Sequence, residues 1–417
     1  MIALRSGARI GNPAWAGGSK VEHNMPEDEP GSATKSAGDF ERNEQNLRFY
    51  DNRQKYLMFV NTCSEKWVVA ERTARELDSL QPAPPAVRFF DAGMGDGTVL
   101  ARVLRSMHQR YKRYPFYVAG KEISLEDVRL TLDKMPDRFL EHPEMVLAVT
   151  NISYSEAPRM VPSSADGLKR HVWKEIALTG STTSEFERQI LELQPFLAES
   201  WRTKVSAKTG SMIPETPTTL VFYREDCKFL LDGVIPRQHE PKADFDLVLA
   251  SQPFRLRAET RFKAERVLAP LARALRPGGR LLGIHSAGND PALEIVQKVW
   301  PGEDPFMTSR RALIDATREA MGELADNYRF DPLPSDQALF RYEMHTLPDE
   351  LDSERATIGT STLLAAWNAA TYVAQIEDHR LAEAMSDSRY LDATRAVLRK
   401  HGELWFNDES YVIVRQQ

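Results

Sequence analysis

The stretch VRFFDAGMGDGT, residues 87–98, decides the fold class of this chain of 417 residues. It begins with residues typical of a buried strand, which run into the acid Asp91. Three glycines follow at alternate positions, Gly93, Gly95 and Gly97, before a helical pattern begins. Glycine allows positive φ angles and lets a ligand approach the backbone closely, and the first N–H groups of a helix attract a carboxylate or a phosphate. The stretch therefore predicts a strand, a ligand-binding turn and a helix in succession.

Strand and helix patterns continue to alternate after this stretch. Further buried strands are expected at residues 116–120, 145–149, 245–250 and 280–285. Helical patterns lie between most of them, and this alternation is typical of a doubly wound, mostly parallel sheet. The sequence therefore predicts an α/β fold.

Composition divides the chain into four parts. Residues 1–39 are poor in large apolar residues and are expected to be disordered, or to form an arm that orders on a second subunit of a homodimer. Residues 40–84 have the pattern of one or two amphipathic helices and are expected to form a lid. The sheet domain is expected to span residues 85–154 and 243–417. Residues 155–242 interrupt the alternation and are expected to be an α+β insertion.

The insertion carries a helical pattern at residues 186–201 and two short apolar runs. The runs, at residues 220–223 and 228–231, are expected to pair as a hairpin. Together with the N-terminal helices, the insertion is expected to cap a substrate pocket above the strand ends.

Charge and cysteine content narrow the function. There are 54 Lys and Arg residues against 60 Asp and Glu, a net charge of −6, which argues against a protein that grips nucleic-acid backbones. Two cysteines cannot form a disulfide framework, and no Cys, His or carboxylate set has metal-ligand spacing. No apolar run approaches the roughly 20 residues that span a bilayer. We expect a cytoplasmic protein without an essential metal or a membrane partner.

The spacing of the glycines distinguishes between ligands. Dinucleotide sites expect Gly-x-Gly-x-x-Gly, whereas here the third glycine, Gly97, comes one residue early and Asp91 precedes the loop. This pattern resembles motif I of the class I S-adenosylmethionine-dependent methyltransferases. The helix-turn-strand pattern of residues 271–284 resembles the same family, and the resemblance covers about residues 85–154 and 243–300. It implies a seven-stranded, Rossmann-like methyltransferase sheet, with S-adenosylmethionine against Asp91, Gly93, Gly95 and Gly97.

Two strand ends carry further candidate cofactor residues. Glu122 follows the second strand, where a carboxylate can accept the hydroxyl groups of a ribose in both NAD and S-adenosylmethionine sites. The resemblance places an adenine contact near Asn151 and Ile152, after the third strand. An asparagine in a plain turn is the alternative interpretation of Asn151.

The fourth and fifth strands end in candidate substrate residues. The resemblance places substrate-facing residues at Ser251, Gln252 and Phe254, and Ser251 is a candidate catalytic residue. Amino-group methyltransferases have a proline where Gln252 stands, which argues against methylation of adenine or glutamine. His285 ends the next strand and is interpreted as a general base or as a hydrogen-bonded structural histidine.

Aromatic residues of the N-terminal helices are candidates for a lid over the site. Tyr50 and Tyr56 are the candidate substrate contacts, and core packing is the alternative role for this aromatic stripe. The predicted function is methyl transfer from S-adenosylmethionine to a nitrogen, oxygen or sulfur atom of a small-molecule acceptor. The alternatives are a non-catalytic regulatory module that binds S-adenosylmethionine, a protein methyltransferase and an NAD-dependent oxidoreductase.

Overall fold

The computed structural model describes residues 53–207, 212–238, 240, 243–345 and 358–417. All of them belong to one of the two units of the chain, Leu47–Gln417. The expected arm at residues 1–39 and the candidate residue Tyr50 lie outside the described residues.

The described residues form one large sheet and a separate two-stranded pair. The strands of the large sheet are β1 (Val87–Asp91), β2 (Phe116–Lys121), β3 (Met145–Thr150), β4 (Val172–Leu178), β7 (Thr218–Arg224), β8 (Phe245–Ser251), β9 (Leu275–Ser286), β10 (Tyr328–Asp331), β11 (Leu339–Glu343) and β12 (Trp405–Arg415). The pair consists of β5 (Thr203–Val205) and β6 (Met212–Pro214).

Helices of varied length connect the strands. They are α2 (Arg53–Thr62), α3 (Glu65–Leu77), α4 (Thr98–Arg110), α5 (Leu125–Asp133), α6 (Met135–Glu141), α7 (Ala165–Arg170), α8 (Thr183–Leu191), α9 (Gln194–Ser200), α10 (Thr260–Lys263), α11 (Ala269–Arg273), α12 (Pro291–Val299), α13 (Arg310–Met321), α14 (Ser335–Ala338), α16 (Thr360–Val373), α17 (Asp378–Ala384) and α18 (Arg389–His401). Four shorter helical segments are η2 (Ala157–Arg159), η3 (Glu225–Cys227), η4 (Ala264–Leu268) and η5 (Gly322–Asn327).

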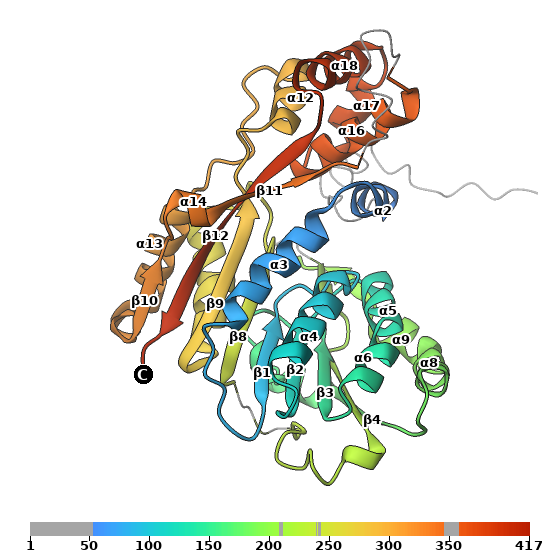
Figure 1. Ribbon diagram of the computed structural model, residues 1–417, viewed down its shortest axis with the longest axis vertical. Coiled ribbons are helices and arrows are strands. Elements are labelled where there is room, and N and C mark those ends of the chain that lie inside the picture. The colour runs from blue at the N-terminus through green and yellow to red at the C-terminus, as the bar shows by residue number, and fades with distance from the viewer. Residues whose placement is uncertain (1–52, 208–211, 239, 241–242, 346–357) are drawn as a thin grey trace, which may run out of the picture. The chain divides into compact units, whose positions relative to one another are not determined.

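The order of the strands identifies the fold. Along the sheet the order is β10-β12-β9-β8-β1-β2-β3-β7-β4, with β11 paired to β12 (Figure 1). The five strands from β3 to β9 are parallel, and β12 lies antiparallel between β9 and β10. The seven strands from β3 to β10 therefore form the Rossmann-like methyltransferase sheet that the sequence predicts.

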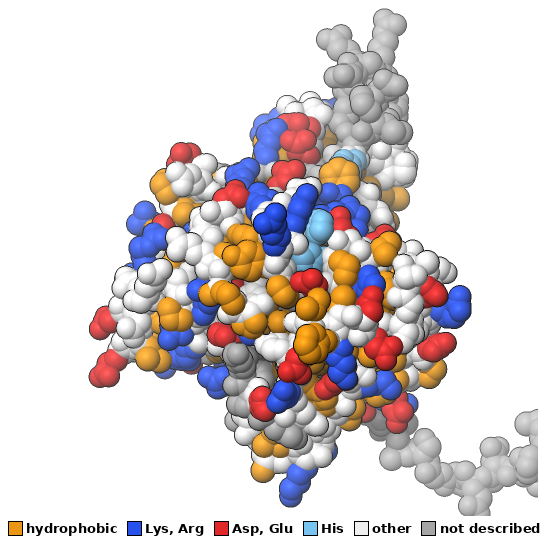
Figure 2. Space-filling model, turned by 60° about the horizontal axis from the view of Figure 1, so that its bottom comes forward, with side chains coloured by type: hydrophobic (Ala, Val, Ile, Leu, Met, Phe, Trp, Pro, Cys, Tyr) orange, Lys and Arg blue, Asp and Glu red, His pale blue; other side chains and the backbone are white. Residues whose placement is uncertain are grey.

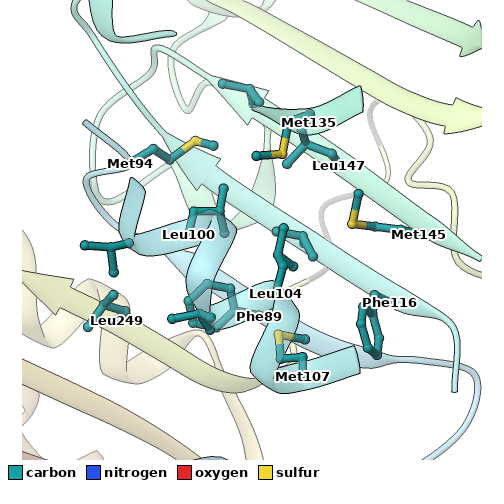
Figure 3. Close-up of a cluster of buried hydrophobic side chains, with 14 of the residues drawn as sticks. Phe89, Met94, Leu100, Leu104, Met107, Phe116, Met135, Met145, Leu147 and Leu249 are labelled. Carbon is teal, nitrogen blue, oxygen red and sulfur yellow. The ribbon is translucent and has the colours of Figure 1, made fainter. Parts of the chain in front are cut away.

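Helices cover both faces of this sheet, which explains the nearly continuous apolar strands. Successive side chains of a strand point to opposite faces, so Phe89 packs in one buried cluster and Phe90 in the other. On the first face, Leu100 and Leu104 of α4 lie over Phe89 (Figure 3). On the other face, α11 and α13 pack against the same strands. The parallel strands are therefore rigid, and they fix the positions of the loops at their carboxyl ends.

A third buried cluster lies beyond the carboxyl ends of β8 and β9. It joins α2, α12, α16, α17 and α18 to the ends of β11 and β12 (Figure 1). We refer to these five helices as the helical cap. Asn368 of α16 donates a hydrogen bond to the carbonyl of Lys55 in α2 (3.0 Å), so segments from both ends of the chain build this cap.

The segment 155–242 adds two strands to the large sheet. β7 pairs antiparallel with β3 and parallel with β4. The expected hairpin of residues 220–223 and 228–231 is therefore wrong. Both edges of β7 are taken by β3 and β4, whereas Phe229 is 92% exposed and lies in a turn, so the run at residues 228–231 forms no strand. A role for this segment over the substrate pocket stays a prediction.

Candidate functional site

The loop between β1 and α4 needs its glycines for different physical reasons. Gly95 and Gly97 have φ angles of +52° and +77°, which side chains rarely adopt. A Cβ atom on Gly97 would lie 2.7 Å from the Cα atom of Thr131 in α5, so this glycine lets two helices approach closely. A Cβ atom on Gly93 would meet nothing within 4 Å. The backbone at Gly93 therefore borders open space, as a loop that cradles a ligand requires.

Asp91 holds the start of this loop. The side chain is buried, and its Oδ1 atom accepts a hydrogen bond from the N–H of Gly93 (3.1 Å). Burial raises the pKa of Asp91 to about 7; the N–H of Gly93 opposes this shift, and the charge of Glu122 adds to it. The loop thus begins at a buried acid whose protonation state depends on the N–H of Gly93 and on the charge of Glu122.

Glu122 joins the end of β2 to the glycine loop. Its Oε2 atom accepts a hydrogen bond from the N–H of Gly95 (2.8 Å). Its Oε1 atom accepts hydrogen bonds from the N–H groups of Ile123 (2.7 Å) and Ser124 (2.8 Å). Burial raises the pKa of Glu122. The structure therefore brings together the acid and the glycine loop that the sequence singles out separately.

Asn151 and Ile152 follow β3, as expected, but the side-chain N–H groups of Asn151 are already used. They donate to the carbonyls of Ser200 (3.2 Å) and Thr216 (3.0 Å), and Oδ1 accepts from the N–H of Thr218 (2.8 Å). Ile152 is buried in the hydrophobic cluster that includes Phe90. Asn151 thus has a structural role in the end of β3, and an adenine contact by either residue stays a prediction.

Tyr56 and Lys66 lie on the side of the loop that faces α2 and α3. A Cβ atom on Gly95 would lie 3.3 Å from the hydroxyl of Tyr56, so this tyrosine contacts the loop. The Nζ atom of Lys66 lies 5.7 Å from the centre of the Tyr56 ring and 3.3 Å from Glu65. Burial would lower the pKa of Lys66, but Glu65 and neighbouring groups, Asp96 among them, raise it well above its usual value. Sequence reasoning missed Glu65 and Lys66, because charged residues in an amphipathic helix usually indicate a solvated face.

A second polar group lies at the ends of β8, β9 and the start of β12. Gln252 has a φ angle of +48° and donates from Nε2 to Ser286 (2.9 Å) and to Asp408 (3.4 Å). Ser286 and Asp408 are paired in the β9–β12 ladder. Sequence reasoning missed Asp408, because no local pattern shows that β12 returns to the middle of the sheet. We refer to Gln252, Ser286 and Asp408 as the strand-end cluster.

The other two candidates of the fourth strand lie beside this cluster. Ser251 is the last residue of β8 and is half-buried. Phe254 is buried under the Nζ atom of Lys263, which lies 5.2 Å from its ring centre. The packing of Phe254 therefore fits a core residue, and contacts of either residue with a substrate stay predictions.

His285 points to the opposite face of the sheet from the strand-end cluster. His285 and Glu409 are opposite each other in the β9–β12 ladder, and their Nε2 and Oε1 atoms lie 2.9 Å apart. Glu409 also accepts hydrogen bonds from the N–H of Arg310 (2.8 Å) and from its guanidinium (2.5 Å). This arrangement favours the structural interpretation of His285 over a general base.

The pair predicts a specific acid sensitivity. Burial would raise the pKa of Glu409, but the hydrogen bonds and charges of His285 and Arg310 lower it from 4.5 to about 2. A carboxyl with a lowered pKa in the folded state stabilises the protein above pH 4.5, and this contribution is lost as the pH falls toward 2. The loss is on the order of 3 kcal/mol.

We expect the unfolding free energy of Glu409→Gln, measured by urea denaturation, to fall less steeply between pH 4.5 and pH 2 than that of the parent chain. Glu71→Gln, at an exposed glutamate of α3, serves as the control; equal slopes for the two variants would contradict the assignment.

Two general properties complete the description. In the described ranges, no group of three or more His, Cys, Asp and Glu side chains is arranged to hold a metal ion. No helix in this part of the chain is long and apolar enough to cross a membrane.

Comparisons with known proteins find similarity in structure alone. No family model and no curated protein matches the chain. A Galdieria sulphuraria protein described as a sarcosine dimethylglycine methyltransferase is 11% identical, with 84% of this chain and 85% of that chain covered and a TM-score of 0.30. A geranyl diphosphate methyltransferase in complex with S-adenosylmethionine is 14% identical, with 83% and 85% covered and a TM-score of 0.29. A Burkholderia thailandensis protein bound to S-adenosylhomocysteine is 12% identical, with 83% and 75% covered and a TM-score of 0.26. At such low scores, the fold assignment rests on the strand order itself.

Proposed function

We propose that this protein transfers the methyl group of S-adenosylmethionine to a small-molecule acceptor. The observation that carries the proposal is the hydrogen bond between Glu122 and the N–H of Gly95. It brings a carboxylate at the end of β2 to a glycine loop at the end of β1, at the carboxyl edge where parallel sheets bind their ligands.

The residues present fit this cofactor. The open space at Gly93 and the positive φ of Gly95 allow a ligand to lie against the backbone. Asp91, Gly93, Gly95 and Gly97 would hold its amino-acid part, and Glu122 would hold its ribose. Bound there, S-adenosylmethionine would supply a methyl group on a positively charged sulfur.

Glu122 is close to its full hydrogen-bonding capacity. A carboxylate offers about four acceptor positions, and backbone N–H groups occupy three of them. One ribose hydroxyl therefore finds a free position, and a second would share or replace the N–H of Gly95. On this account, binding of a ribose loosens the contact between Glu122 and the loop.

The protein's own contribution to the reaction is alignment and the exclusion of water. The sheet fixes the loop, and α2 of the helical cap brings Tyr56 against Gly95. Arg257, after β8, is tied to the cap by hydrogen bonds to the carbonyls of Ala374 (3.0 Å) and Gln375 (2.7 Å). We infer that cap and loop close over the reacting groups together.

A small molecule is the acceptor that the surface charge favours. On the face shown in Figure 2, basic and acidic side chains are interspersed and form no continuous basic stripe. The net charge of −6 also argues against a nucleic-acid partner. The insertion at residues 155–242 contributes α9, whose neighbour Trp201 donates a hydrogen bond to the carbonyl of Glu122 (2.9 Å), so it can shape the ribose end of the site.

The proposal is tested by incubating the full chain with methyl-labelled S-adenosylmethionine and a panel of small amines, alcohols and thiols. Labelled product together with S-adenosylhomocysteine is the expected result. Binding without transfer to any acceptor would favour a non-catalytic module. Labelling of the protein fraction alone would favour a protein methyltransferase, and binding of NAD instead would favour an oxidoreductase.

A further inference from the structure

We infer that the methyl acceptor is an amine and that Asp408 holds its nitrogen. This inference rests on the proposed function and adds a substrate class to it. The observation behind it is a buried carboxylate with one unused oxygen, in the strand-end cluster on the side of the sheet that faces α3.

Asp408 is fully buried and incompletely satisfied. Its side chain has no exposed surface. Its Oδ1 atom accepts the long hydrogen bond from Gln252 (3.4 Å), whereas Oδ2 has no hydrogen-bond partner within the described ranges. Buried polar atoms without partners are rare and costly, so such an atom calls for a hydrogen-bonding partner.

The surrounding charges do not supply that partner. Burial raises the pKa of Asp408 well above its usual value and the carboxylate of Glu65 adds to the shift, whereas a side-chain hydrogen bond with Ser286 opposes it. Lys66 is paired with Glu65. Asp290 raises the pKa of Asp408 further, and its own oxygens are occupied by the N–H groups of Leu293 (2.8 Å) and Asn407 (3.0 Å). Arg72 of α3 donates to Ser410, two residues further along β12, but it is paired with Glu76. Carboxylates therefore outnumber cations around Asp408.

An amine matches this environment better than other ligands. A carboxylate or a phosphate would bring negative charge next to Glu65 and would offer no N–H donor to Asp408. An amine offers N–H donors and, when protonated, the positive charge that the region lacks. The aromatic rings of Phe59, Tyr342 and Phe406 pack beside the start of β12, with the rings of Tyr342 and Phe406 stacked 4.9 Å apart, so apolar substituents of the amine would have aromatic neighbours.

Asp408 also has a role in the chemistry. In its ionised form it accepts a proton from the bound ammonium group, which frees the nitrogen lone pair. With S-adenosylmethionine bound, the lone pair would form the bond to the methyl carbon as the carbon–sulfur bond breaks, and that electron pair would stay on sulfur. The positive charge would pass to nitrogen, and the proton taken up earlier would remain on Asp408 until the product leaves.

The test uses amines and alcohols of matched size. The melting temperature of the full chain is measured with ethylamine, butylamine and benzylamine, and with ethanol, butanol and benzyl alcohol. Each titration is run with and without S-adenosylhomocysteine. We expect at least one amine to raise the melting temperature and its alcohol to leave it unchanged. Equal responses to amine and alcohol, or no response to any amine, would overturn the inference.

Two variants of neighbouring residues separate binding from structure. Asp408→Asn should weaken binding of the amine by about tenfold or more, which is the scale for losing a charged hydrogen bond. It should leave the affinity for S-adenosylhomocysteine unchanged and raise the melting temperature without ligands, because it removes a buried acid. Glu409→Gln, on the opposite face of β12, should lower the melting temperature and keep the amine response. An unchanged amine response in Asp408→Asn would overturn the inference. Failure of S-adenosylhomocysteine to bind would instead overturn the proposed function. The amine titrations without S-adenosylhomocysteine would still show whether Asp408 binds an amine.

Discussion

Gly95→Arg is expected to abolish binding of S-adenosylhomocysteine while the chain stays folded. The backbone of Gly95 donates to Glu122, and a Cβ atom there would already lie 3.3 Å from the hydroxyl of Tyr56. A long side chain at this position must fill the space over the loop, and it also adds a positive charge. Isothermal calorimetry measures the binding, and circular dichroism measures the fold.

A control separates this steric effect from backbone strain. Gly95 has a positive φ angle, and any side chain there costs about 1 kcal/mol of stability. Gly402, at the C-terminus of α18, also has a positive φ angle, and a Cβ atom there would meet nothing within 4 Å. Gly402→Arg therefore introduces a similar backbone strain, and it should bind S-adenosylhomocysteine with the affinity of the parent chain. Unchanged affinity in Gly95→Arg would place the ligand elsewhere.

Glu122→Ala should weaken the binding of S-adenosylhomocysteine by about 1–3 kcal/mol, the range for losing hydrogen bonds to a charged group. The substitution removes the acceptor for a ribose hydroxyl and leaves the N–H groups of Gly95, Ile123 and Ser124 without their partner. The loop should also become less ordered, so a lower melting temperature is expected. Calorimetry and thermal denaturation of the same samples measure both effects.

Two further variants sharpen this result. Glu122→Gln keeps the shape and one acceptor oxygen, and should lose less affinity than Glu122→Ala. Glu126→Ala removes an exposed carboxylate from the first turn of α5, and should leave the affinity unchanged. If Glu122→Ala and Glu126→Ala bound equally well, Glu122 would have no part in holding the ribose.

The proximity of Asp91, the glycine loop and Glu122 could be predicted from the sequence because its signals are local. Asp91, Gly93 and Gly95 lie within five consecutive residues of the chain, at the end of a parallel strand where ligands commonly bind. To place Glu122 beside this loop, one further fact is needed: adjacent parallel strands end at the same edge of the sheet. The structure places these residues together through the hydrogen bonds of Asp91 and Glu122.

The strand-end cluster could not be predicted in this way. Asp408 meets Gln252 only because β12 returns between β9 and β10, and no local pattern encodes that return. The pairing of β7 with β3 and β4 was not predicted, for the same reason. A nearby apolar run suggested a hairpin instead. Local spacing also could not show that His285 points to the face of Glu409 and away from Asp408.

A calorimetric titration of S-adenosylhomocysteine into the full chain tests the proposed cofactor site. We expect saturable binding at one site per chain, which competes with S-adenosylmethionine and is lost in Gly95→Arg. No heat of binding at millimolar ligand, or full binding by Gly95→Arg, would contradict it.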